Sequence, residues 1–190
     1  KNNSSATSNY SLLFSYPETI EIIDSKIYNN YISGGNIFSG RFRIKNCSIL
    51  ENTVGNSCLD LSSEAINCII ADNSSGYETI IARPGSRIIN CTISNNSTDY
   101  GGALRVDLTE SGKYVSILNS IIWNNSDCIP HGMYEGGDPS EWVMCGAGQI
   151  NYIYDRTDGG FEYYGQAGLA ISNSIIGDLI FDDLPQGLVL

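Results

Sequence analysis

The chain has 190 residues, and its 10 basic and 21 acidic side chains give a formal net charge of −11. This balance disfavours nucleic acid and anionic membranes as partners, because contacts to phosphate need Lys and Arg. No apolar run is long enough to span a bilayer, so we expect no membrane insertion. The length is that of one domain, and a composition rich in Asn, Ser and Gly with six Cys favours an extracellular location.

Residues 1–19 precede the repetitive part of the chain. They are rich in Ser and Asn, show no helical periodicity and contain a proline at Pro17. We therefore predict an irregular N-terminal arm that includes a partial first coil.

From residue 20 onward, one short pattern occurs six times. The residue before its central Ser or Cys is Asn or Asp, the residue two positions after it is Ile, and the residue five positions after it is Asn in five copies. The central residues are Ser25, Cys47, Cys68, Cys91, Ser120 and Ser174, at successive intervals of 22, 21, 23, 29 and 54 residues. A period in the low twenties built on short β-branched segments is typical of a solenoid, in which each repeat adds one coil.

The Asn or Asp before each central residue is predicted to form a corner between two strands. Side chains alternate along a straight strand, yet the apolar or small positions −3, 0 and +2 break this alternation once. Asn and Asp adopt the left-handed backbone conformation more readily than other residues that carry a Cβ. Stacked corners place their amides about 4.8 Å apart, where they can hydrogen-bond along the axis. The predicted structural ladder comprises Asn46, Asn67, Asn90, Asn119 and Asn173.

A second regularity supports the same alignment of the coils. The residues four positions before the first four centres alternate in charge: Glu21, Arg43, Glu64 and Arg87. If the coils stack in this register, each charge lies beside its opposite on the outer face, which is favourable by roughly 0.2–1 kcal/mol for each pair.

The segments Asn90–Asn96 and Asn119–Asn125 give the chain a family resemblance. Their pattern resembles the right-handed parallel β-helix repeats of secreted pectate-lyase-like enzymes, phage tailspikes and large bacterial surface proteins. The resemblance covers roughly residues 20–126 and extends over 166–180. It implies an all-β fold, a right-handed parallel β-helix over residues 20–190. With the excess of the last interval removed, the length predicts about seven coils at a period of about 22 residues. Such a fold does not specify a chemistry.

Residues 127–165 interrupt the repeat and are predicted to form one long loop insertion. Long loops on rigid scaffolds often carry function, and the alternative is that this loop covers an end or an apolar side of the stack. Its aromatic side chains Trp142, Tyr134 and Tyr154 are candidates for stacking on sugar rings, or else for a small loop core. Cys128 and Cys145 are expected to form a disulfide, which restricts the unfolded loop by roughly 3 kcal/mol.

Three of the other cysteines, Cys47, Cys68 and Cys91, occupy the central position of successive repeats. We interpret them as an inward column of small apolar side chains, since Ser fills the same position in the other copies. Metal or redox chemistry is the alternative reading of this column. Cys58 has no obvious partner in the sequence.

The resemblance also suggests where an enzyme would have its site. A polysaccharide lyase would hold Ca²⁺ with clustered carboxylates against a uronate and take up a proton with Arg or Lys. The best such cluster comprises Arg105, Asp107, Glu110 and Lys113. Because the few basic residues are scattered and there is a single His, we expect no catalytic residues, no metal and no cofactor, with Ca²⁺ reserved for the lyase alternative.

The function expected from these observations is that of an extracellular structural or adhesive module. It would be a self-associating building block of a filament or of a larger cell-surface protein, because the ends of a stack without caps offer unpaired strand edges. Its expected partners are other copies of itself or neighbouring domains, and glycans. The alternative is a polysaccharide lyase, a glycoside hydrolase or a carbohydrate-binding β-helix that acts near residues 107–114 and 127–165.

Overall fold

The computed structural model describes residues 4–5, 11–99, 102–107, 113–127, 150–153, 156–157, 160–161, 168–172 and 174–176. All regular secondary structure in these residues is β-strand. Within the same ranges, no helix is long and apolar enough to cross a membrane.

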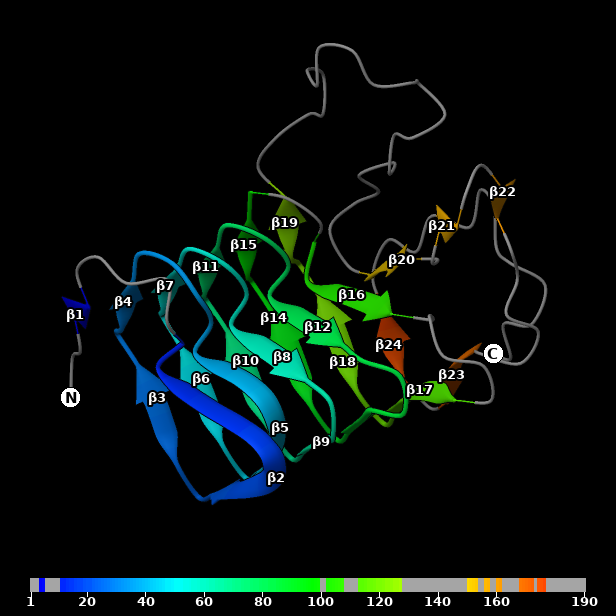
Figure 1. Cartoon of the computed structure of the whole chain (residues 1–190), viewed down its shortest axis with the longest axis horizontal. Helices are drawn as coiled ribbons and strands as arrows, with labels where there is room; N and C mark the ends of the chain where they lie inside the picture. The colour runs from blue at the N-terminus through cyan, green and yellow to red at the C-terminus, as the bar shows by residue number, and fades with distance from the viewer. Residues whose placement is uncertain are drawn as a thin grey trace, which may run out of the picture.

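The strands stack in parallel and form a β-solenoid, which confirms the predicted fold class (Figure 1). Sheet A contains β1 (Ser4–Ser5), β4 (Tyr31–Ile32), β7 (Thr53–Val54), β11 (Ser74–Ser75), β15 (Ser97–Thr98) and β19 (Ser126–Asp127). Sheet C contains β3 (Lys26–Tyr28), β6 (Ser48–Leu50), β10 (Ile69–Ala71), β14 (Thr92–Ser94), β18 (Ile121–Trp123) and β24 (Ile175–Ile176).

Sheet B has two arms that meet in the long strand β5 (Phe38–Lys45). Phe38–Gly40 pairs with β8 of arm B1, which consists of β8 (Leu59–Leu61), β12 (Ile80–Ala82), β16 (Leu104–Asp107) and β20 (Ile150–Ile153). The second half of β5 pairs with β9 of arm B2, which consists of β9 (Glu64–Ile66), β13 (Arg87–Ile89), β17 (Tyr114–Leu118) and β23 (Gly168–Ser172). β21 (Arg156–Thr157) and β22 (Gly160–Phe161) form a separate antiparallel pair.

The described residues complete about four turns, because the chain leaves sheet C at β3 and returns to it at β6, β10, β14 and β18. The expected count of about seven is therefore wrong. It divided the whole chain outside the insertion by the period, and thereby counted both ends as complete coils. β1 and β2 (Leu13–Ile23) at the start, and β20, β23 and β24 at the end, extend the sheets as partial turns.

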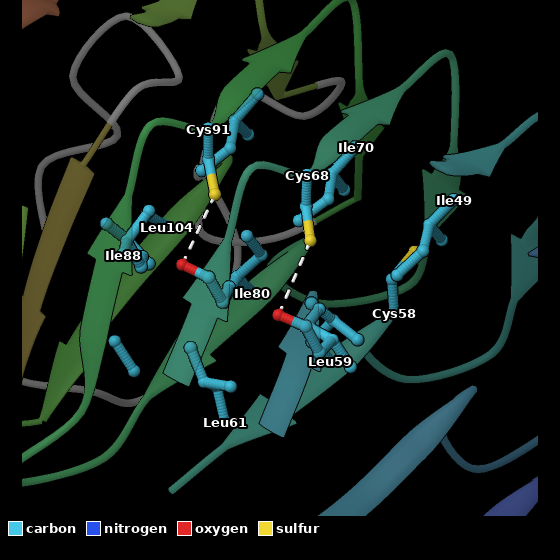
Figure 2. Packing of buried hydrophobic residues seen from close by; sticks show 14 of the residues in the cluster. Ile49, Cys58, Leu59, Leu61, Cys68, Ile70, Ile80, Ile88, Cys91 and Leu104 are labelled. Carbon is cyan, nitrogen blue, oxygen red and sulfur yellow. Dashed lines mark hydrogen bonds between the residues drawn. The ribbon is translucent and has the colours of Figure 1, made fainter. Parts of the chain in front are cut away.

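The register within sheet C is the one that the repeat predicts. Ile70 lies opposite Ile49 on one side and opposite Ile93 on the other, all on parallel strands. These three side chains are fully buried and belong to one continuous core (Figure 2). Burying an Ile side chain stabilises the fold by roughly 1.5–3 kcal/mol, so this column contributes strongly to the stack.

The corner residues have the expected left-handed backbone. Asp24, Asn46, Asn67, Asn90 and Asn119 have φ between 49° and 53°. In the first four of these, each Asn donates from Nδ2 to the Oδ1 of the preceding corner, at 2.9 Å to Asp24 and at 3.1 Å in the next two steps. Asn173, the last predicted member of this ladder, lies outside the described residues.

Each coil also contains a second left-handed corner, five residues after the first. It is occupied by Asn29, Glu51, Asp72, Asn95 and Asn124, with φ between 53° and 57°. The two corners enclose the short strand of sheet C in every turn, which is why the inward Ile repeats so regularly.

The two irregular segments expected from the sequence are partly strand. Within the predicted arm, residues 13–15 of β2 pair with Phe38–Gly40 of β5, and the pairing resumes after a register shift at Ile20. Gly40 has φ of 117° and lies so close to the Ser15 carbonyl that a Cβ would not fit. Within the predicted insertion, β20 pairs in parallel with β16 and so adds a strand to arm B1. Cys128, Cys145, Tyr134, Trp142 and Tyr154 lie outside the described residues, and so does Glu110.

Candidate functional site

The outer face of arm B1 gathers four charged side chains. In the strands β8, β12 and β16 the outward positions are Asp60, Ile81 and Arg105, which lie opposite one another in consecutive coils. Their neighbours in each strand point inward and are fully buried core residues. The alternation of a short strand thus places one side chain of each coil on this face.

Asp60 forms an ion pair with Arg83, which directly follows β12. Arg83 donates from Nε to Oδ1 at 2.7 Å and from a terminal guanidinium nitrogen to Oδ2 at 2.9 Å. This two-point geometry is the strongest that an Arg and a carboxylate can adopt, because both hydrogen bonds are charge-assisted.

Glu78 forms the second ion pair, with Arg105 of the next coil. The guanidinium of Arg105 donates to Oε1 at 3.2 Å, and the side chain of Glu78 is only 8% exposed. The other carboxylate oxygen, Oε2, and the Nε of Arg105 are both buried, and within the described part of the chain neither has a hydrogen-bond partner. A buried polar atom without a partner is costly, so this pair retains an unused acceptor beside an unused donor.

The two ion pairs lie on opposite sides of Ile81. Glu78 precedes β12 and reaches toward the following coil, whereas Arg83 follows β12 and reaches toward the preceding one. Each carboxylate is thus neutralised by its own guanidinium. The two unpartnered atoms of the Glu78–Arg105 pair are shielded from solvent, so a ligand on this face meets the partly exposed side chains of Asp60, Arg83 and Arg105 instead.

Of the two predicted residues whose side chains the structure describes, Arg105 and Lys113, Arg105 takes part in this charged cluster. Asp107 ends β16 and its side chain lies outside the description, as does the whole of Glu110. Lys113 is exposed, and its side chain lies near Gly85 in the turn after β12. Asp60, Glu78 and Arg83 were missed. The sequence did hold one indication of this cluster, because Asp60 and Arg105 occupy equivalent positions in their repeats, between two apolar residues of a strand.

The cysteine column forms part of the core. Cys47, Cys68 and Cys91 are free thiols, and each donates both to the carbonyl two residues before it and to a carbonyl of the preceding coil. Cys68 donates to the Ile44 carbonyl at 3.6 Å and Cys91 to the Ala65 carbonyl at 3.4 Å. Figure 2 marks one hydrogen bond from each of these two thiols with a dashed line. This supports the reading of the column as small buried side chains.

The pKa values of the thiols follow their surroundings. Burial raises the pKa of Cys47, and burial also raises the pKa of Cys58 to about 12. The hydrogen bond between Cys68 and Cys91 raises the pKa of the first thiol and lowers that of the second. Across the described residues, no group of three or more His, Cys, Asp or Glu side chains is arranged to hold a metal ion.

Comparisons with protein-family models, with curated proteins and with solved structures find no match for this chain. The fold and the geometry of its faces therefore carry the functional argument.

Proposed function

We propose that this protein is an extracellular structural or adhesive module whose coil stack associates with other copies of itself through its ends. We infer the location from the composition, which is rich in Asn, Ser and Gly and contains 16% charged residues. The stacked corners support the distant kinship with right-handed β-helices of the pectate-lyase-like and surface-protein type that the repeat suggests.

The observation that carries the proposal is the apolar first turn of the stack. Among the described residues, seven of the twelve exposed large apolar side chains lie between positions 13 and 31. They are Leu13, Phe14, Tyr16, Ile20, Ile23, Tyr28 and Tyr31. Such a concentration at one end is typical of a surface that a partner covers.

The backbone at the same end favours association as well. β2 pairs only with β5, and β3 pairs only with β6, so in the described part each of them is an edge of its sheet. An edge strand with unpaired amides and carbonyls is a template for a further strand. Together with the apolar side chains, it makes this end of the stack suitable for contact with another copy.

Sedimentation velocity over a range of concentrations tests this proposal. We expect the natural protein to form dimers or longer species, and the double variant Phe14→Ser/Tyr31→Ser to remain a monomer. The matched control is Tyr77→Ser/Tyr114→Ser, which removes two similarly exposed aromatic residues outside the first turn and should associate normally. Circular dichroism of each variant verifies its fold. A natural protein that stays monomeric at high concentration would refute the proposal.

A second candidate function is carbohydrate binding at the outer face of arm B1, supported by the partly exposed charged side chains of Asp60, Arg83 and Arg105. Lyase chemistry is a poorer fit. Ca²⁺ takes six or more oxygen ligands, whereas Asp60 and Glu78 are each engaged by a guanidinium, so the described residues do not suit the ion. Titration with oligogalacturonate tests this candidate: Arg105→Gln should abolish binding, and Lys113→Gln should not.

A further inference from the structure

We propose that the outer face of sheet C binds an uncharged, extended polysaccharide chain. This site lies on a different sheet from the charged cluster of arm B1, and it shares Tyr28 with the exposed first turn.

The face consists of two rows of outward side chains, which we call the sheet C strip. One row contains Lys26, Ser48, Ile69, Thr92 and Ile121, and the other contains Tyr28, Leu50, Ala71, Ser94 and Trp123. Both rows follow from the register, because the residue between each pair is an inward Ile of the core.

The charge of the strip selects its ligand. Lys26, at one end, is the single charged residue among the ten, and the corners that border the strip carry the exposed carboxylates of Asp24, Glu51 and Asp72. The outer face of arm B1 is very different, since Asp60, Arg83 and Arg105 carry charges there. An anionic ligand would be repelled by the carboxylates at the border of the sheet C strip, whereas a neutral one would lose no ionic hydration on binding to it.

Two aromatic residues mark the ends of the second row. Tyr28 and Trp123 are 42% and 53% exposed, and four coil steps separate them, which corresponds to about 19 Å at the spacing of parallel strands. Leu50, the buried Ala71 and Ser94 lie between them, so the two rings are the largest groups of the row. The apolar C–H face of a pyranose ring stacks on such aromatic surfaces, and two of them can hold two sugars of one chain.

Polar groups lie along the strip and at its border. Hydroxyls of Ser48, Thr92 and Ser94 lie within it, and the exposed amides of Asn46, Asn67 and Asn90 line its border once per coil. An extended polysaccharide presents hydroxyls with a regular spacing of similar size, one ring after another. It can therefore hydrogen-bond to Ser48 and again to Thr92 and Ser94, two coils further along.

The size of the strip argues against a second copy of the protein as its occupant. Four coil steps by three residues of strand give roughly 20 × 10 Å, or about 200 Å². A stable protein interface needs about 800 Å² from each partner. A single sugar chain has the width of the strip, so its whole length can lie on the two rows.

Isothermal titration with neutral β-1,4-linked hexasaccharides of glucose, N-acetylglucosamine, xylose and mannose tests the proposal. We expect at least one of them to bind the natural protein, and Trp123→Ala and Tyr28→Ala each to weaken that binding about ten-fold or more. The controls Tyr77→Ala and Tyr114→Ala remove similarly exposed aromatics elsewhere and should change the affinity less than about two-fold. Arg105→Gln should also leave it unchanged, which separates this site from arm B1.

Three outcomes would overturn the proposal. The first is the absence of binding to all four hexasaccharides, and the second is an equal loss of affinity in the control variants. The third is a sedimentation coefficient that decreases in Trp123→Ala without sugar, because this would show that the strip is a contact between copies. A negative result of the sedimentation experiment with Phe14→Ser/Tyr31→Ser would leave the proposal of polysaccharide binding at sheet C intact.

Discussion

The Oδ1 atom of Asn96 accepts two hydrogen bonds from Asn73, one from its backbone N–H at 3.1 Å and one from its Nδ2 at 2.9 Å. The same pair of hydrogen bonds, from the backbone N–H and from Nδ2 to the Oδ1 of the next Asn, joins Asn30 to Asn52, Asn52 to Asn73 and Asn96 to Asn125. All five side chains are buried inside the solenoid. Burying an amide is unfavourable unless its hydrogen bonds are made, and this inner ladder makes them in every coil.

Replacing Asn73 with Ala should destabilise the protein strongly. The change removes the acceptor of two donors of Asn52, a donor to Asn96 and the bond from Nδ2 to the Ile49 carbonyl. Each buried group left unpaired costs about 1–3 kcal/mol, so we expect a loss of roughly 3–5 kcal/mol in the free energy of unfolding. Urea denaturation followed by circular dichroism measures it.

The matched control for Asn73→Ala is Asn67→Gly in the outer corner ladder. Asn67 is exposed and has φ of 53°, a conformation that Gly adopts without strain. The control therefore loses only solvent-accessible side-chain bonds and should cost less than about 1 kcal/mol. An equal loss in both variants would show that burial of the ladder does not matter.

The sequence revealed the position of the inner ladder but not its role. Asn at five residues after the centre was visible in five of six copies, yet Asn is usually exposed, so nothing in the pattern alone placed it inside. Its inward direction depends on the second corner, one residue earlier, where Asn29, Glu51 and Asp72 follow no single residue type. The outer ladder was easier to predict, because Asn or Asp occurs at that corner in every copy.

The alternating charges were also predictable. Glu64 forms ion pairs with Arg43 and with Arg87, both at 2.9 Å, as the repeat register indicates. Glu21 lies opposite Arg43 but binds Lys45 at 2.7 Å instead, and this hydrogen bond lowers the pKa of the Glu21 carboxyl. The repeat determines which strands are adjacent. A long side chain can still pair with either of two oppositely charged residues on the adjacent strand, as Glu21 does with Lys45 and not Arg43.

We expect Glu64→Gln to lower the free energy of unfolding by about 1–2 kcal/mol in low salt, because two ion pairs share this carboxylate. The effect should shrink near 1 M NaCl, where screening is strong. Glu21→Gln is the control, since its more exposed pair with Lys45 should contribute less than the two pairs of Glu64. Thermal or urea unfolding at both salt concentrations measures the difference. A Glu64 effect that is independent of salt would contradict the ionic explanation.

The charged cluster of arm B1 was beyond the reach of the repeat. Glu78 and Arg83 flank β12 rather than occupying a strand position, and the lengths of these connecting segments differ between coils. The repeat predicts the positions of residues that recur in every coil. Residues in turns of variable length do not recur, so only the structure assigns them to a face. The predicted neighbours of Arg105 were chosen by closeness in sequence, while its actual partner comes from the preceding coil, 27 residues away.

Cys68→Ser should be tolerated, because Ser120 occupies the equivalent position and donates to the Leu118 carbonyl two residues before it, as the thiol of Cys68 does to Ile66. We expect a change below about 1 kcal/mol in the free energy of unfolding. Cys58→Ser places a hydroxyl among fully buried apolar side chains and should cost about 1–3 kcal/mol. Equal effects in the two variants, measured by urea denaturation, would contradict this distinction.

The buried thiol of Cys58 should make the protein less stable in alkali. Its pKa is raised from the ordinary value of 9.0 to about 12 by burial. Below about pH 9 the thiol is protonated in both the folded and the unfolded protein, so its ionisation does not reduce the free energy of unfolding there. Above that pH the unfolded chain releases the proton while the folded protein keeps it, and the free energy of unfolding falls by about 1.4 kcal/mol for each pH unit. The loss ends near the folded pKa, after a total of roughly 4 kcal/mol.

Comparison with Cys58→Ala isolates this thiol from the tyrosines and lysines that also titrate in alkali. Urea denaturation of both proteins between pH 8 and pH 11 should show the variant less stable at the lower pH, because it loses apolar packing. As the pH rises, the free energy of unfolding of the variant should fall less steeply than that of the natural protein, by about 1.4 kcal/mol for each pH unit. The two curves of free energy against pH should therefore converge. Parallel curves over the whole range would mean that Cys58 is equally acidic in the folded and unfolded states, and hence that it is not buried from water as the fold requires.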